Sequence, residues 1–329
     1  MPGAKERELR RRIGSVQSTK KITRAMELIA ATRVVKAMQR ANEARPYSTQ
    51  ITGVIENLVA AGARVDHPLM RQTETPARVG IIAITSDRGL AGAYNASVIR
   101  AAEHQLNVAR NEGADYSLVL IGKKAVDYFT FRNYRIDAKY TGMSDTPRYE
   151  DAREVADHIV AEFTAGRLDR VELVYTEFVT MGTQRVTTRR YLPLANTQTM
   201  AEIGGGSKAA VAEVEFEPSP GGVLESLLPR YMESRLYSAM LEAAASEHAN
   251  RQRAMKAATD NAEDLITKLS REMNQARQAS ITTEIMEIVS GAEALGSGTD
   301  ADGLAAALLE LNNPMAAAAA GVINPSPES

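Results

Sequence analysis

The sequence predicts a central α/β domain held between two long helices that pair as an antiparallel coiled coil. Twelve of the 16 aromatic residues fall between Tyr94 and Tyr191, so only the middle of the chain has the bulky side chains of a globular core. Arg230 to Ser290 contains neither Gly nor Pro over 61 residues, longer than an ordinary globular helix. Between these regions, apolar runs alternate with helical patterns, which favours an α/β fold.

Residues 1–61 are predicted to form the N-terminal coiled-coil helix. Apolar residues recur at steps of three and four, the helical period. We expect Pro46 to kink or interrupt the helix, because it lacks a backbone donor. Residues 62–76 hold Gly62, Pro68 and Pro76 and are predicted to be a linker. The repeating apolar positions before Pro46 are Leu9, Ile13, Val16, Ile22, Met26, Ile29, Val34, Ala37, Met38 and Ala41.

Residues 77–193 are predicted to form an open, Rossmann-like α/β domain with helices on both faces of a sheet. The uninterrupted apolar runs are typical of buried parallel strands, and the last two strands form a possible hairpin. The expected strands are Val79–Ile84, Tyr116–Ile121, Arg135–Tyr140, Val171–Phe178 and Arg185–Leu192. The expected helices are Asn95–Asn111, Lys123–Asn133 and Glu150–Ala165. Residues 194–222 follow as a loop with a short strand near Val211–Phe216.

Residues 223–295 are predicted to form the C-terminal coiled-coil helix. At about 1.5 Å per residue, its breaker-free stretch alone would be roughly 90 Å long. Steps of four and three give a coiled-coil seam, and the simplest arrangement pairs this helix antiparallel with the N-terminal one. Residues 296–329 are an acidic tail without Lys or Arg, which we expect to be mostly disordered. The seam residues are Arg251, Met255, Ala258, Ala262, Leu265, Leu269, Met273 and Ala276.

Composition and charge exclude several classes. The chain has no Cys, which excludes disulfide frameworks and Cys-based metal or catalytic sites. No apolar run approaches the roughly 18 residues that suggest a membrane span, so a soluble, cytoplasmic chain is expected. Residues 1–45 hold 12 Lys/Arg and 4 Asp/Glu, a net of +8, although the whole chain has a formal charge of −2. This polarity indicates an acidic partner, which could be nucleic acid, anionic lipid or a protein surface.

The loop Ser86–Gly92 (SDRGLAG) follows the first predicted strand, where doubly wound folds bind phosphates. Its spacing fits neither a dinucleotide-binding nor a P-loop motif. We therefore interpret it as a structural turn formed by Asp87, Arg88, Gly89 and Gly92. The four His residues form no ligand pair, and no catalytic constellation stands out. The sequence predicts no catalytic residue, no cofactor and no metal.

Three sequence blocks together resemble the gamma subunit of the F-type ATP synthase, the central rotor shaft. Lys20–Leu28 (KKITRAMEL) resembles the family's N-terminal motif, and Ser86–Gly92 resembles its central loop. The block from Ile281 to Ala292 matches the family's C-terminal signature at each fixed position. Met255–Ala262 (MKAATDNA) adds a fourth block, and the resemblance covers about residues 3–295.

The resemblance implies a non-catalytic subunit that transmits torque between a proton-driven membrane ring and the catalytic alpha–beta hexamer. Its implied partners are the alpha and beta subunits, the epsilon subunit and the membrane c-ring, without nucleic acid and without direct membrane insertion. The implied location is peripheral, on the cytoplasmic face of a bacterial plasma membrane. The residues implied to contact the hexamer are Lys21, Arg24, Met26, Arg251, Gln278, Thr282, Glu284 and Glu287.

Two other functions stay open at the level of sequence. One is an enzyme that uses the Ser86–Gly92 loop. The other is a coiled-coil adaptor that binds nucleic acid through residues 1–45, although that segment lacks the interleaved aromatic residues that would stack on bases.

Overall fold

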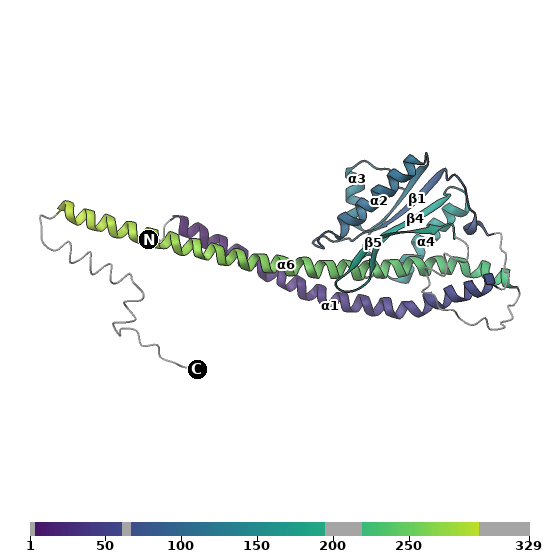
Figure 1. The fold of residues 1–329 in the computed structure, drawn as a ribbon, viewed down its shortest axis with the longest axis horizontal. Helices are drawn as coiled ribbons and strands as arrows, with labels where there is room; N and C mark the ends of the chain where they lie inside the picture. The colour runs from purple at the N-terminus through teal and green to yellow at the C-terminus, as the bar shows by residue number, and fades with distance from the viewer. Residues whose placement is uncertain (1–3, 61–66, 195–218, 296–329) are drawn as a thin grey trace, which may run out of the picture. The chain divides into compact units, whose positions relative to one another are not determined.

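The computed structural model describes residues 4–60, 67–194 and 219–295. Along the chain, one long helix precedes a five-stranded α/β region and another follows it (Figure 1). No helix among these residues is long and apolar enough to cross a membrane. The elements are α1 (Ala4–Ala60), η1 (Pro68–Met70), β1 (Arg78–Ile84), α2 (Tyr94–Asn111), β2 (Asp115–Ile121), α3 (Lys123–Phe131), β3 (Ala138–Tyr140), α4 (Tyr149–Thr164), β4 (Arg170–Phe178), β5 (Gln184–Leu192) and α6 (Pro220–Leu295).

The sheet has the strand order β3-β2-β1-β4-β5, and all pairs are parallel except the β4–β5 hairpin. Successive side chains of β1 point to opposite faces. Ile81 and Ala83 pack with α2 and α3, whereas Ile82 and Ile84 pack with α4, the end of α1 and the start of α6. Both faces of the sheet are therefore covered, which explains the uninterrupted apolar run of β1 and confirms the predicted α/β class.

Contacts within the chain divide it into two compact units. The globular unit is Thr23–Ala258, and the tip unit is Met1–Ile22 together with Thr259–Ser329. Each unit therefore includes part of both long helices.

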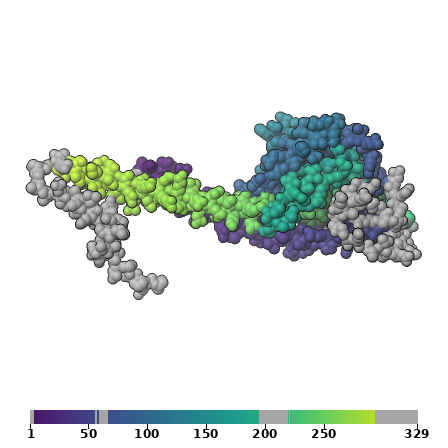
Figure 2. All heavy atoms as spheres, in the orientation of Figure 1, coloured from purple at the N-terminus to yellow at the C-terminus, as the bar shows by residue number. Residues whose placement is uncertain are grey.

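The long helices run antiparallel in the globular unit. Arg33 of α1 and His248 of α6 both contact Asp145. Further along α1, Tyr47 lines the same hollow as Arg230 of α6. Later residues of α1 therefore lie beside earlier residues of α6. In the tip unit, Lys20 forms an ion pair of 3.2 Å with Glu263, and the two helices lie side by side in Figures 1 and 2. This pairing confirms the predicted coiled coil.

Helix α1 differs from its sequence pattern in two respects. It continues through Pro46 without interruption. Pro46 and Asn42 are both exposed, so water can bind the carbonyl group that the proline ring leaves free. Between residues 22 and 30 the buried face is also shifted by one residue, because Ile22 and Ile29 are 61% and 56% exposed while their neighbours Thr23 and Ala30 are buried.

Smaller differences occur elsewhere. Leu265, assigned to the seam of α6, is 37% exposed, and its neighbour Ile266 is the half-buried residue. Strand β3 starts at Ala138 rather than at Arg135, whose guanidinium instead pairs with Asp115 at 2.9 Å. The predicted strand near 211–216 and the tail 296–329 lie outside the described residues, as do residues 62–66 of the predicted linker.

A glycine packed against the backbone gives the first testable prediction. Gly122, at the end of β2, has a φ of 96°, and a Cβ there would lie 2.2 Å from the carbonyl oxygen of Thr85. Gly113 has a φ of 77° but open space around it. We expect Gly122→Ala to lower the free energy of unfolding by about 3 kcal/mol or more, since backbone must shift. Gly113→Ala should cost only about 1–2 kcal/mol of strain.

Urea unfolding of the full chain, followed by circular dichroism, measures both variants. Equal losses would contradict the close approach of Gly122 to Thr85.

Candidate functional site

The Ser86–Gly92 loop is held as a rigid turn by its own polar groups. The carboxylate of Asp87 accepts bonds from the backbone N–H of Ser144 at 3.1 Å and of Lys123 at 3.0 Å. The Ser144 hydroxyl in turn donates to Asp87 Oδ2 and accepts from the Asp87 N–H. Burial alone would raise the pKa of Asp87. The hydrogen bonds stabilise the charged carboxylate more strongly, so the pKa of Asp87 is lowered overall.

The same loop offers little to a phosphate. The N–H of Ser86 donates to Asn95 Oδ1 at 2.9 Å, and the N–H of Asp87 donates to Ser144 Oγ at 2.8 Å. Two of the loop's backbone donors are therefore occupied within the chain, and the ionised Asp87 would repel an anion. This geometry supports the structural-turn interpretation and not a nucleotide site.

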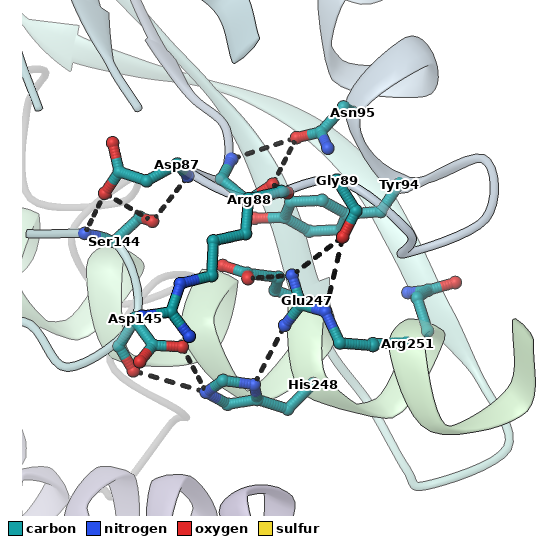
Figure 3. Close-up of polar contacts among 12 residues, drawn as sticks. Asp87, Arg88, Gly89, Tyr94, Asn95, Ser144, Asp145, Glu247, His248 and Arg251 are labelled. Carbon is teal, nitrogen blue, oxygen red and sulfur yellow. Dashed lines mark hydrogen bonds and ion pairs between the residues drawn. The ribbon is translucent and has the colours of Figure 1, made fainter. Parts of the chain in front are cut away.

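Arg251 of α6 joins this loop to the long helix (Figure 3). Its guanidinium donates to the carbonyl oxygen of Gly89 at 3.3 and 3.4 Å and to Glu247 Oε1 at 2.6 Å. Only 7% of Arg251 is exposed. The sequence had placed Arg251 among the hexamer contacts. Within this chain Arg251 is buried and bonds to Glu247, one turn before it on the same helix face, and its contact with the hexamer stays a prediction.

A buried polar cluster surrounds Arg251, and we call Arg33, Asp145, Glu247, His248 and Arg251 the polar latch. His248 Nε2 lies 3.2 Å from the carbonyl oxygen of Asp145, and its Nδ1 lies 3.3 Å from Arg251. Arg33 of α1 pairs with the Asp145 carboxylate at 2.6 Å. The latch therefore joins α1, α6 and the segment before α4. Through the bond from Arg251 to Gly89 it also reaches the loop (Figure 3).

The latch also contains three groups of a kind that binds metals. Ligand atoms of Asp145, Glu247 and His248 all lie within 4.8 Å of one another. Two guanidinium groups already neutralise them, however, since Arg33 pairs with Asp145 and Arg251 pairs with Glu247. The donor set therefore fits an internal ion-pair network better than a cation site.

The other predicted contact residues lie on the two long helices. Lys21 and Arg24 are exposed, and Met26 is half-buried beside them on α1. Arg24 also pairs with Glu27 at 2.9 Å. On α6 the exposed residues are Gln278, Thr282, Glu284 and Glu287. These residues are therefore exposed or half-buried positions of α1 and α6, and their contact with the hexamer stays a prediction.

Sequence analysis missed two features of this region. It did not predict the latch residues Asp145, Glu247 and His248, although Glu247 and Arg251 stand at the i, i+4 spacing of a helical ion pair. It also assigned Ile22 and Ile29 to the coiled-coil seam, whereas both belong to a set of exposed apolar side chains on α1 that includes Leu28 and Val35. Adjacent apolar pairs such as Leu28–Ile29 could have indicated this exposed set, because two neighbouring residues cannot both point into the same coiled-coil seam.

Comparisons with known proteins agree with this architecture. A family model described as ATP synthase matches residues 5–295. The chain is 52% identical to the ATP synthase gamma chain of Frankia casuarinae over 297 residues, covering 89% of this chain and 98% of the relative. The gamma chain of Mycolicibacterium smegmatis is 46% identical over 303 residues, with 88% and 97% covered.

Two solved structures share the fold. The central stalk and c-ring of the Tetrahymena thermophila mitochondrial ATP synthase match with a TM-score of 0.53 and 24% identity, over 72% of this chain and 99% of that chain. A Euglena gracilis mitochondrial ATP synthase rotor matches with a TM-score of 0.60 and 18% identity, over 84% and 98%. These matches define the class as an ATP synthase protein of central-stalk fold. Within that class, the chain belongs to the family of ATP synthase gamma chains.

The latch gives a prediction of pH dependence. Burial raises the pKa of Glu247 to about 7, although Arg251 opposes the shift. An unfolded Glu titrates near 4.3, so the folded chain binds more protons between these values and loses stability as pH rises through this window. The glutamine side chain of the Glu247→Gln variant does not ionise, so its stability lacks this pH dependence. We therefore expect its stability relative to the wild type to rise between about pH 4.5 and 7, by on the order of 2–3 kcal/mol.

Urea unfolding at several pH values measures this difference. Glu272→Gln, which changes an exposed Glu of the same helix, is the control and should show a flat difference. A flat profile for Glu247→Gln as well would contradict the assigned ionisation.

Proposed function

We propose that this chain is the rotary central shaft of an F-type ATP synthase, which transmits torque between an ion-driven membrane ring and the catalytic alpha–beta hexamer. The observation that supports this proposal most directly is the family match over residues 5–295. The shaft is non-catalytic, in agreement with a loop whose donors are used internally and a latch whose charges are paired.

Helix α6 supports a mechanical role. Its first part packs in the core of the globular unit, where Leu224, Leu228, Tyr231 and Met232 are all buried. The same helix continues without a break to Leu295. Because the domain core and the coiled coil share one helix, a torque on the domain turns the helix directly. The latch adds polar bonds that resist slippage of α6 against the loop and α1.

The proposed partners are the alpha and beta subunits, the epsilon subunit and the c-ring. The exposed, basic N-terminal part of α1 suits an acidic surface of the hexamer. We place the chain at the cytoplasmic face of a bacterial plasma membrane, as a peripheral subunit. The family match includes the basic segment, which leaves the nucleic-acid adaptor without an observation in its favour.

The proposed hexamer contacts are the surface residues Lys21, Arg24, Gln278, Thr282, Glu284 and Glu287, together with the half-buried Met26. Arg251 acts differently in this proposal. It contacts Gly89 and Glu247 and therefore positions the loop.

Met26→Lys tests the N-terminal contact. A lysine there adds a cation that faces an acidic loop of the hexamer, and the new ion pair must break during each turn. We expect weaker coupling, with several-fold less proton pumping per ATP hydrolysed in inverted membrane vesicles. Met26→Leu keeps an apolar side chain of similar volume and should pump normally. Normal pumping by the Lys variant, with normal ATP hydrolysis, would contradict the contact.

Thr282 and Thr283 offer a matched pair for the tip. Both are exposed, and each hydroxyl donates to the carbonyl oxygen four residues earlier, at 3.0 Å to Gln278 and at 2.9 Å to Ala279. Replacement by Ala therefore changes the helix equally at both positions. We expect Thr282→Ala to lower ATP synthesis several-fold in membrane vesicles, and Thr283→Ala to leave it near wild type. Equal effects would argue against a specific contact at Thr282.

A further inference from the structure

A polar hollow lies between the two long helices and the hairpin of the globular unit. We call it the arginine hollow. It is bounded by Ala41–Thr52 of α1, by Tyr231–Glu242 of α6 and by Tyr175 and Arg189 of the β4–β5 pair. Its volume is about 360 Å³. That volume lies within the range of small-molecule sites, and the proposed function does not use it.

Three guanidinium groups line the hollow. Arg45 is exposed and forms no hydrogen bond or ion pair with the described part of the chain. Arg189 donates to Glu177 at 2.6 Å. Arg235 donates to the carbonyl oxygens of Arg190 and Tyr191 at 2.9 and 3.3 Å. Because these carbonyl groups are uncharged, they leave the positive charge of Arg235 unneutralised. The lining therefore carries an excess of positive charge.

Two buried polar atoms on the lining have no partner among the described residues. The hydroxyl group of Tyr231 is unpaired although only 1% of the residue is exposed. Glu242 Oε2, three turns along the same face of α6, is also unpaired. Unpaired buried groups of this kind cost free energy and are uncommon, so a bound group that accepts from the Tyr231 hydroxyl is the physical explanation with the fewest assumptions.

The remaining polar groups are mainly donors. Ser48, Thr49 and Ser238 add hydroxyl groups to the lining. Burial raises the pKa of Glu242, although Arg189, a hydrogen bond from Tyr175 and Arg45 oppose this, and Glu242 is the one carboxyl group among the lining residues. Cations and hydroxyl donors with few acceptors match an oxyanion, whose oxygen atoms accept several bonds at once.

We propose that the arginine hollow binds a phosphate-type oxyanion, with Arg45 and Arg189 pairing with its charge and the Tyr231 hydroxyl donating to one of its oxygen atoms. Arg235 stacks on the ring of Tyr231, with 5.6 Å from its guanidinium carbon to the ring centroid, and so positions that hydroxyl. An anion bound here touches α1, α6 and β5 together. It would therefore stiffen the junction between the long helices and the sheet.

Calorimetric titration of the full chain with inorganic phosphate and with pyrophosphate tests the proposal. We expect saturable binding of one anion per chain. Arg45→Gln should weaken binding about tenfold or more, since a charge-assisted bond contributes roughly 1.5–3 kcal/mol. The matched control is Arg40→Gln, which removes the same charge from an exposed residue of α1 outside the hollow; its affinity should stay within twofold of wild type.

Tyr231→Phe separates binding from folding. It removes only the unpaired hydroxyl, so the variant should unfold at the same urea concentration as the wild type or a higher one. Its affinity for pyrophosphate should nevertheless fall about tenfold. Hydrogen exchange should show that pyrophosphate protects residues 41–52 and 231–242 in the wild type and not in Arg45→Gln.

Three results would overturn the proposal. One is the absence of saturable binding of either anion. Another is an equal loss of affinity in Arg40→Gln, which would indicate diffuse attraction to a basic surface. The third is a failure of both anions to bind while Arg45→Gln weakens assembly with the alpha and beta subunits. That result would mean that the hollow receives an acidic side chain of another subunit.

Discussion

One helix belongs to both the globular core and the coiled coil, and the other features of this chain depend on that constraint. The N-terminal part of α6 is buried against the sheet and α4, and its later turns pair with α1. A helix shared in this way cannot rotate independently of the domain without breaking a continuous ladder of backbone hydrogen bonds. The constraint also explains the composition. Residues that suit a close helix pair, such as Ala262 and Leu269, replace the bulky rings found in the domain.

The polar latch stands where the apolar packing of α6 gives way to the coiled coil. Burying charges is costly, and a buried ion pair often stabilises less than apolar packing of the same volume would. The latch fixes one register of α6 instead, because Arg251 binds the carbonyl oxygen of Gly89 and His248 contacts that of Asp145, where an apolar contact could slide. The unpaired Oε2 of Glu247 is the energetic cost of that arrangement.

Much of the fold could be predicted from local patterns. The apolar runs of β1 and β2 and the absence of helix breakers between Arg230 and Ser290 are strong signals, and the helices and strands predicted within the described residues appear near their predicted positions. The exact buried face of α1 could not be predicted, because Leu28–Ile29 offers two adjacent apolar residues and only tertiary packing selects between them.

The site was harder to predict than the fold. The burial of Arg251 could not be predicted, because Gly89, whose carbonyl oxygen it binds, is 162 residues away in the sequence. No local pattern brings those residues together. The arginine hollow was hidden for the same reason, since Arg45, Arg189 and Arg235 belong to three different elements.

Direct observation of rotation tests the central claim that this chain is the shaft. The sequence has no Cys, so Phe131→Cys, at an 82% exposed position on α3, provides one attachment point for a visible probe. The variant is assembled with alpha and beta subunits that are fixed to a surface, and ATP is added. The account predicts that the probe turns continuously in one direction while ATP is hydrolysed. A probe that stays fixed during sustained hydrolysis by the assembled complex, or a chain that never joins the hexamer, would contradict it.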